Sequence, residues 1–246
     1  MIKSAHSSQL PVTDTGKEPP IETRVLFGGS FDPIHNGHIL SAKHVMQWLG
    51  MNKLDVNKLT FIPAHISPHK QSTSASAQQR TNMVKLVCAE NPNFTCDERE
   101  IKRATHNKNP SYTVESLREI KQENPHSRLF FIMGMDALLS FTQWHQWQEI
   151  LSLTHLVINT RPNYPLTNLS EDTSNLLAQY KVDNITELAN TTAGHILFAP
   201  SIEYPISSTD IREKIKANQN CEKLLPETVL AYIQQHRLYT ASALTN

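Results

Sequence analysis

The residues best suited to chemistry stand in one short stretch, VLFGGSFDPIHNGHIL, at positions 25–40. It holds three of the chain's seven glycines together with His35 and His38, three residues apart. Glycines let an anion approach the backbone closely, and residues three apart at the start of a helix lie on the same side. The pattern predicts a loop that holds phosphate groups.

Two other interpretations of the histidines stay open at this point. His35 and His38 could ligate zinc, although no third His, Cys or acidic residue stands at a convincing spacing. They could also be ordinary polar residues at a helix start. The spacing of the glycines matches neither GxGxxG nor GxxxxGK[ST], so it predicts neither a dinucleotide fingerprint nor a P-loop.

A second stretch, ISSTDIREKI at 206–215, places three hydroxyl residues before an amphipathic helix with Arg212 in its first turn. A cation there opposes the helix dipole, and a bound anion would resolve the conflict. The alternative is an ordinary helix cap with Arg212 in solvent. Together, the two stretches supply two helix N-termini that could hold one polyphosphate.

The loop PAHISPHK, just after the second apolar strand, brings His69 and Lys70 close to His65 in the sequence. It could neutralise phosphate charge, or it could be a solvated basic loop.

The stretch FIMGMDALLSFTQWHQW places Asp136 directly after a buried strand that ends at Gly134. A carboxylate at that edge suits a ribose, and Trp144 could stack on a flat heterocycle. Alternatively, Asp136 caps the next helix and Trp144 belongs to the core.

The elements that must position these residues alternate along the chain. Continuous apolar runs predict strands that are buried on both faces, and period-3.6 patterns predict helices between them. We therefore expect an α/β fold with a doubly wound, mainly parallel sheet, helices on both faces and a C-terminal helical segment. The expected strands are 23–29, 58–64, 94–101 (or an edge segment), 128–134, 154–162 and 195–200, and the expected helices are 38–50, 77–91, 111–125 (capped by Ser111 or Thr113), 207–218 and 225–238.

The domain organisation follows from composition. Residues 1–22, rich in Ser, Thr and Pro, are expected to form a disordered leader. We expect one domain over 23–240, with the polar stretch 163–193 as its least structured part and a surface insertion, and a short tail at 241–246.

The balance of charged residues limits the classes of binding partner that we expect. Lys plus Arg and Asp plus Glu number 23 each, so the chain has no polybasic character and we expect neither nucleic-acid nor membrane binding. Three cysteines without a CxxC pair favour a reducing, cytoplasmic location. No apolar run approaches the ~20 residues of a membrane span. Monomer and homodimer both stay open.

GGSFDPIHNGH and ISSTDIR resemble the two signatures of the HxGH nucleotidyltransferase superfamily, whose fold is Rossmann-like. The intervening IPAHISPHK, DEREIKR, PSYTVESL, GMDALLSFTQW and RPNYPL, and the closing LLPETVLAYIQQHRLY, resemble the bacterial nicotinate-nucleotide adenylyltransferases. The resemblance covers roughly residues 23–240. The chain differs from that pattern at Ser30, Lys70, Met135 and His145, where Thr, Arg, a polar residue and Tyr are common.

The resemblance implies an adenylyl transfer from ATP to nicotinate mononucleotide, on the way to NAD. It implies catalytic roles for His35, His38 and Arg212. It implies that ATP contacts Gly28, Gly29, Ser30, Phe31, His35, His38, Lys70, Gly134, Asp136, Ile206, Ser207, Ser208, Thr209 and Arg212. It implies that the pyridine substrate contacts His69, Tyr112, Thr113, Trp144 and His145.

Elementary chemistry agrees with a direct transfer. A phosphomonoester, with a second pKa of ~6, is already an anionic nucleophile near neutral pH and needs no general base. The sequence offers cations and helix N-termini, and no convincing Ser/His/Asp or Cys/His set. We expect Mg²⁺ to be held mainly by the ATP phosphates and no dedicated metal site in the protein. Transfer to nicotinamide mononucleotide or phosphopantetheine, and a nucleotide-binding regulator without catalysis, are the alternatives.

Overall fold

The computed structural model describes residues 21–65, 73–106, 111–160, 169–188, 191–200 and 206–241. The expected leader, the expected tail, His69 and Lys70 therefore lie wholly or almost wholly outside the described residues. The assignment of residues 23–240 to one domain stays a prediction.

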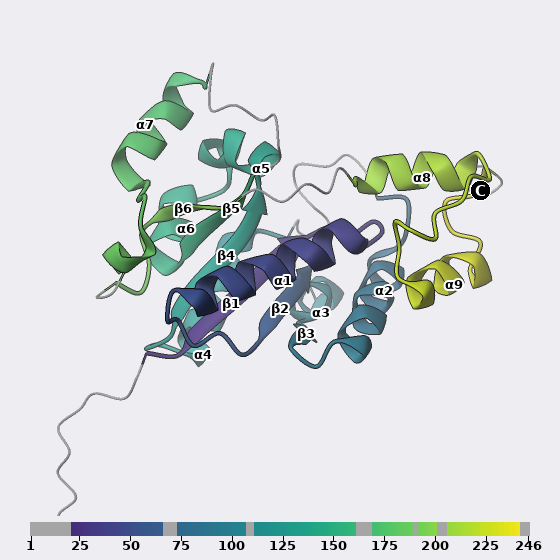
Figure 1. Ribbon diagram of the computed structural model, residues 1–246, viewed down its shortest axis with the longest axis horizontal. Coiled ribbons are helices and arrows are strands. Elements are labelled where there is room, and N and C mark those ends of the chain that lie inside the picture. Colours follow the sequence, from purple (N-terminus) through teal and green to yellow (C-terminus); the bar gives the residue numbers. More distant parts are fainter. Residues whose placement is uncertain are drawn as a thin grey trace, which may run out of the picture.

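Within the described ranges, six parallel strands form one sheet in the order β3-β2-β1-β4-β5-β6 (Figure 1). This is the strand order of the Rossmann fold, whose direction of winding reverses between β1 and β4. The predicted α/β class with a doubly wound parallel sheet is confirmed. The strands are β1 (Thr23–Gly29), β2 (Leu59–Pro63), β3 (Phe94–Cys96), β4 (Arg128–Gly134), β5 (His155–Asn159) and β6 (Ile196–Ala199).

The central strands are apolar without a break because helices cover both faces of the sheet. In β4, Phe130 and Ile132 belong to one hydrophobic cluster, and Leu129, Phe131 and Met133 belong to the other. Successive side chains of a strand point to opposite faces, so one continuous apolar run serves two cores. Each large side chain buried there contributes roughly 1.5–3 kcal/mol.

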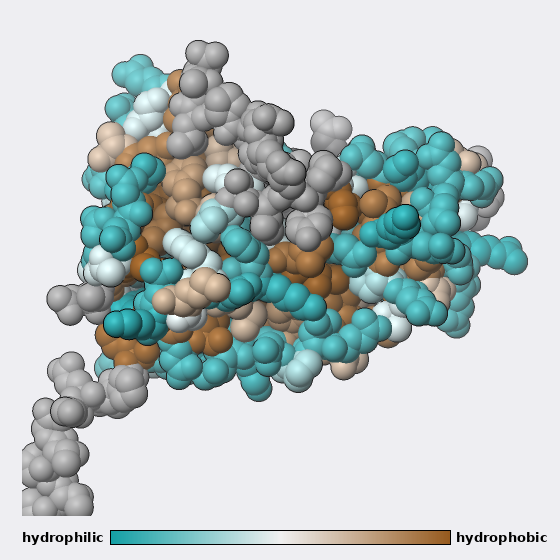
Figure 2. Space-filling model, viewed as in Figure 1, coloured by the Kyte–Doolittle hydropathy of each residue, from teal (hydrophilic) through white to brown (hydrophobic). Residues whose placement is uncertain are grey.

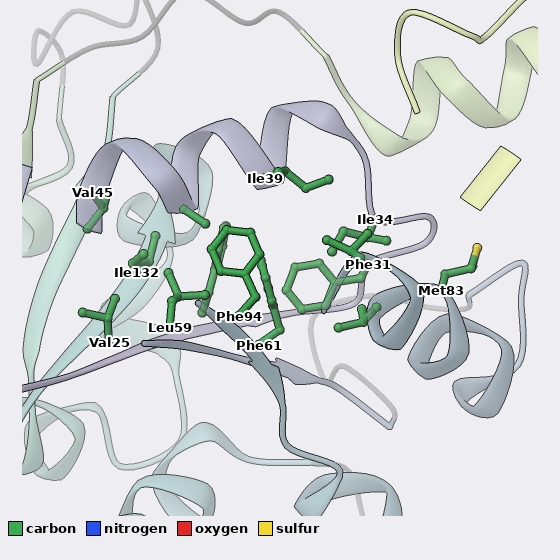
Figure 3. Close-up of a cluster of buried hydrophobic side chains, with 14 of the residues drawn as sticks. Val25, Phe31, Ile34, Ile39, Val45, Leu59, Phe61, Met83, Phe94 and Ile132 are labelled. Atoms are coloured by element: carbon green, nitrogen blue, oxygen red, sulfur yellow. The ribbon is translucent and has the colours of Figure 1, made fainter. Parts of the chain in front are cut away.

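The first face is covered by α1 (Asn36–Met51), α2 (Ala77–Glu90), α8 (Ser208–Lys216) and α9 (Glu227–Gln235). Figure 3 shows Ile39 and Val45 of α1 lying over the apolar side chains of the strands. Figure 2 shows mainly hydrophilic residues on the outward side of α8 and α9, as expected for helices that bury only one face.

The second face is covered by α4 (Thr113–Glu123), α5 (Met135–Leu139), η1 (Phe141–Gln143), α6 (Trp147–Leu153) and α7 (Glu171–Tyr180). Ion pairs join α4 to its neighbours: Arg103 of α3 (Arg99–His106) contacts Glu115 and Glu119, and Arg118 contacts Glu149 of α6. These contacts fix the helix whose first turn borders the site described below.

Three sequence expectations need correction. The stretch 94–101 is strand only as far as Cys96, and helix α3 follows from Arg99. Helix α4 is capped by Tyr112 without a side-chain hydrogen bond, and not by Ser111 or Thr113. The stretch 163–193 contains α7, whose Leu176 and Leu177 are buried in the second cluster, so its polar composition hid an ordered helix. Whether the stretch is an insertion stays a prediction.

Candidate active site

A cavity of about 630 Å³ opens at the carboxyl ends of β1, β4 and β5, where the sheet reverses its direction of winding. Ligand sites of small molecules typically measure ~300–1,000 Å³ and lie at this place in open α/β sheets. The first turns of α1, α4 and α8 also border the cavity. Helix N-termini carry unsatisfied N–H groups and partial positive charge, so the cavity suits an anionic ligand.

Two glycines bring β1 to the cavity wall. A Cβ at Gly28 would lie 2.6 Å from the Phe131 ring, and one at Gly29 would lie 3.0 Å from the Phe31 ring. The close approach of these rings is therefore sufficient reason for glycine at both positions. Close approach of a phosphate, which the sequence predicts for both glycines, is thus not needed to explain them.

His35 and His38 cap α1 in an unusual way. The main-chain N–H of His35 donates to His38 Nδ1 at 3.3 Å, and that of His38 donates to His35 Nδ1 at 3.4 Å, in addition to its 2.9 Å bond to the His35 carbonyl. The arrangement is a capping box made of imidazoles, where Ser or Thr and Glu are usual.

The reciprocal capping bonds also decide which nitrogen carries the proton. A neutral imidazole has one donor and one acceptor nitrogen, so rings that accept at Nδ1 carry their proton on Nε2. The two rings stack with centroids 3.8 Å apart, and the edge of the Phe31 ring packs against His38 at 5.2 Å. Both histidines line the cavity, and their Nε2–H groups suit donation to an oxyanion.

Helix α8 closes the opposite side. Ser207 caps the helix by accepting from the Asp210 N–H at 3.1 Å, and Ser208 Oγ donates to the Pro33 carbonyl at 3.0 Å. Arg212 donates to the Asp32 carbonyl at 2.8 Å and to Thr209 Oγ1 at 3.3 Å. The bonds to Pro33 and Asp32 tie α8 to the loop that precedes α1.

These contacts divide the hydroxyl groups of α8 by role. The Ser208 hydroxyl proton is already donated to the Pro33 carbonyl, so Ser208 can offer only its main-chain N–H to an anion. The Ser207 and Thr209 hydroxyls accept in the bonds above and keep their protons for donation to another group.

Aromatic side chains form one part of the cavity wall, the aromatic end. Tyr112, Trp144 and His145 line it, and the rings of Tyr112 and His145 lie 4.4 Å apart. The uncapped first turn of α4, with Thr113, borders the same end. A planar ring with an anionic substituent would find stacking surfaces and main-chain N–H donors there.

Asp136 also lines the cavity, where it is exposed in the first turn of α5, after Gly134. Its neighbour Met135 is 3% exposed and belongs to the second hydrophobic cluster. The apolar residue beside Asp136 is thus explained by burial.

The sequence matches the cytidylyltransferase-like family over residues 26–214. It is 42% identical over 220 residues to a probable nicotinate-nucleotide adenylyltransferase of Aeromonas salmonicida, which covers 88% of this chain and 96% of that protein. It is 39% identical over 217 residues to the nicotinate-nucleotide adenylyltransferase of Escherichia coli (strain CFT073), covering 88% and 98%. The chain belongs to the nicotinate-nucleotide adenylyltransferase family.

Solved structures support the fold of this family member. The nicotinic acid mononucleotide adenylyltransferase of Plasmodium falciparum, solved in complex with NaAD, superposes with a TM-score of 0.62 at 16% identity, over 89% of this chain and 97% of that one. The same enzyme in complex with APC gives a TM-score of 0.60 at 15% identity. At such identities the likeness shows the fold alone.

The structure brings the predicted residues of this adenylyltransferase-family site to one cavity, except for His69 and Lys70, which lie outside the described residues. The predicted residues that line it are Gly28, Gly29, Ser30, Phe31, His35, His38, Tyr112, Thr113, Gly134, Asp136, Trp144, His145, Ile206, Ser207, Ser208, Thr209 and Arg212.

Sequence reasoning missed a buried carboxyl group in the cavity wall. Glu100 of α3 is 7% exposed and accepts a hydrogen bond from Ser116 Oγ at 2.9 Å. Burial raises the pKa of Glu100, while hydrogen bonds from Ser116 and Ser111 and the charge of Arg103 oppose that rise. The signal was hidden because the stretch containing Glu100 was predicted as a strand or edge segment.

Two negative findings apply to the residues the structure describes. No helix there is long and apolar enough to cross a membrane. No group of three His, Cys, Asp or Glu side chains there could hold a metal ion.

Proposed function

We propose that this cavity transfers the adenylyl group of ATP to nicotinate mononucleotide, giving nicotinate adenine dinucleotide and pyrophosphate. The observation that carries the proposal is the meeting of three features in one cavity: the imidazole pair at the start of α1, the hydroxyl and guanidinium groups of α8, and the aromatic end. Family membership at 39–42% identity agrees with it.

The reaction is a single displacement. A phosphate oxygen of the mononucleotide attacks the α-phosphorus of ATP, the new P–O bond forms, and the bond to the leaving pyrophosphate breaks. No proton needs to be removed from the nucleophile, because a phosphomonoester is largely dianionic at neutral pH. Catalysis then consists of positioning and of stabilising negative charge.

Side chains that line the cavity would position the substrates and stabilise the negative charge. We assign His35 and His38 to the phosphoryl oxygens through their Nε2–H groups, and Thr209 and Arg212 to the β- and γ-phosphates. Asp136 would accept hydrogen bonds from the ribose hydroxyls. Gly28, Gly29, Ser30 and Phe31 would border the nucleotide, and Ile206 and Ser207 would contact it near the adenine.

The acceptor would occupy the aromatic end. Trp144 would stack on the pyridine ring, and the first turn of α4 at Tyr112 and Thr113 would donate to its carboxylate. His145 would close this end beside Tyr112. The contacts proposed for His69 and Lys70 rest on the resemblance alone.

A divalent metal is usual in nucleotidyltransferases, and we propose Mg²⁺ bound to the ATP phosphates and water. The N–H and O–H donors that line the cavity suit phosphate oxygens, so we propose that the metal reaches the site bound to the nucleotide. When bound, it would neutralise phosphate charge.

We also retain the cytoplasmic location as a proposal. Cys88, Cys96 and Cys221 are free thiols, which agrees with a reducing compartment. Monomer and homodimer stay open.

The test is pyrophosphate release with Mg·ATP and, in parallel, nicotinate mononucleotide, nicotinamide mononucleotide or phosphopantetheine. We expect release with the first acceptor. Release only with another acceptor would keep the phosphate chemistry and overturn the assignment of the aromatic end. ATP binding without release in any reaction would support a nucleotide-binding regulator.

A further inference from the structure

We propose that Tyr239 and Arg80 are positioning residues that fix the loop preceding α1, and with it the two histidines, through contacts to Asp32 and Ser30. The inference rests on the proposed adenylyl transfer. Neither residue is among those that line the cavity, so both would act on the reaction only through the loop.

Asp32 is the point at which distant parts of the chain meet. The residue is 4% exposed, and its carboxylate accepts from Tyr239 Oη at 2.8 Å, from the Ser74 N–H at 2.8 Å and from the Ala75 N–H at 3.2 Å. Its main-chain carbonyl accepts from Arg212 at 2.8 Å. Bonds to a charged acceptor are stronger than neutral ones, so this set holds Asp32 tightly.

Arg80 holds the other end of the same loop. Its side chain is fully buried, and its guanidinium donates to three main-chain carbonyls: those of Ser30, His65 (2.8 Å) and Ala75 (3.3 Å). Burial lowers the pKa of Arg80, and the negative charge of Asp32 nearby opposes that shift. The three bonds leave from three different nitrogen atoms of the planar guanidinium, a spread of donors that the single ammonium nitrogen of a lysine does not reproduce.

The anchors flank a strained residue. Phe31 lies between Ser30 and Asp32 and has φ of 47°, a left-handed conformation that a bulky side chain rarely adopts. Tyr239, which binds Asp32, is left-handed too, with φ of 63°. Strain of this kind persists only where surrounding contacts enforce it, and here they do so from both sides.

Phe31 links the anchors to the reacting groups. Its ring is 2% exposed and packs edge-on against Phe61 at 5.5 Å, beside which Figure 3 shows it, and against the His38 ring at 5.2 Å. Release of Asp32 would allow Phe31 to relax and His38 to shift. A shift of about 1 Å in a reacting group can cost ~100-fold in rate.

The experiment compares Tyr239→Phe with Tyr232→Phe. Each variant loses one tyrosine hydroxyl from the C-terminal part of the chain. Tyr232→Phe is the control, because the Tyr232 hydroxyl accepts a hydrogen bond from Asn82 of α2 at 3.1 Å and not from the loop that precedes α1. We expect Tyr239→Phe to lower kcat by about 10-fold to 100-fold with KM for ATP changed less than about twofold. Tyr232→Phe should keep wild-type kinetics.

Amide hydrogen exchange measures the order of the loop directly, without relying on catalytic turnover. Amides of residues 30–36 should exchange faster in Tyr239→Phe and at the wild-type rate in Tyr232→Phe. Unchanged kcat and unchanged loop exchange in Tyr239→Phe, or equal losses in both variants, would overturn the proposal. An inactive wild-type chain would instead refute the proposed function, while the exchange comparison would still decide the positioning role.

Arg80→Lys is the second variant, since it keeps the buried charge and is more apt to fold than a neutral replacement. It should reproduce the kcat loss and the faster loop exchange. A folded Arg80→Lys chain with normal kcat would show that the three carbonyl contacts of Arg80 do not position the loop.

Discussion

Gly28→Ala tests the packing that places β1 beside the cavity. The added Cβ would lie 2.6 Å from Phe131 Cζ and 3.0 Å from Cε2, well inside the ~3.5 Å at which carbon atoms make favourable contact. Phe131 is 4% exposed and packed in the second hydrophobic cluster, so its ring cannot turn away freely. Overpacking of this kind costs about 1–3 kcal/mol of unfolding free energy.

Urea denaturation measures this loss, and Gly50→Ala is the matched control. Nothing lies within 4 Å of a Cβ at Gly50, which is in the last turns of α1, so that variant should gain about 0.5–1 kcal/mol. The double variant Gly28→Ala/Phe131→Leu should be more stable than the sum of the two single losses predicts, because the clash is removed. A Gly28→Ala chain as stable as wild type, or strictly additive losses, would refute the argument.

Three further predictions follow from the site and its surroundings. His38→Asn keeps an acceptor for the His35 N–H and removes the Nε2 donor. The value of kcat should fall ~100-fold to ~1,000-fold with nearly unchanged ATP affinity. Steady-state kinetics that show only a raised KM would contradict this role. Burial lowers the pKa of His155 to about 3, below the value of 6.5 in the unfolded chain, so the unfolded state binds more protons between these values. The free energy of unfolding should therefore rise by up to about 1.4 kcal/mol per pH unit as pH increases through this window, and be lost as pH decreases through it. His155→Leu should flatten that dependence in urea titrations at pH 4.5–7, and an unchanged slope would contradict the assignment. Burial raises the pKa of Glu100, so its contribution to stability is present at low pH and is lost as pH rises above 4.5. The free energy of unfolding of Glu100→Gln, relative to that of wild type, should therefore increase from pH 5 to pH 8. The same difference between the two chains at pH 5 and at pH 8 would contradict this reasoning.

The sequence predicted the sheet and many of the residues that line the cavity, because local signals carry that information. The short, continuous apolar run RLFFIMG, stopped by glycine, is typical of a strand buried on both faces, and hydroxyl residues before an amphipathic segment mark the start of α8. Likewise, glycines and histidines between a strand and a helix predicted a ligand loop, and the structure adds a packing reason for both glycines and a capping role for both histidines.

Other features depend on contacts that no local pattern records. Asp32 and Tyr239 are 207 positions apart and meet only in the folded chain. The reason for Gly28 is the ring of Phe131, which comes from a neighbouring strand. Helix α7 is polar on most of its surface, so its two buried leucines were too weak a signal to predict it.

The central claim is a direct attack of the mononucleotide phosphate on the α-phosphorus of ATP. It is tested most directly with ATP carrying a sulfur of known configuration on the α-phosphorus, together with nicotinate mononucleotide and Mg²⁺. A single displacement predicts a dinucleotide product with inverted configuration at that phosphorus. Retention would contradict the account, because it would require a covalent adenylyl intermediate on a side chain of the cavity.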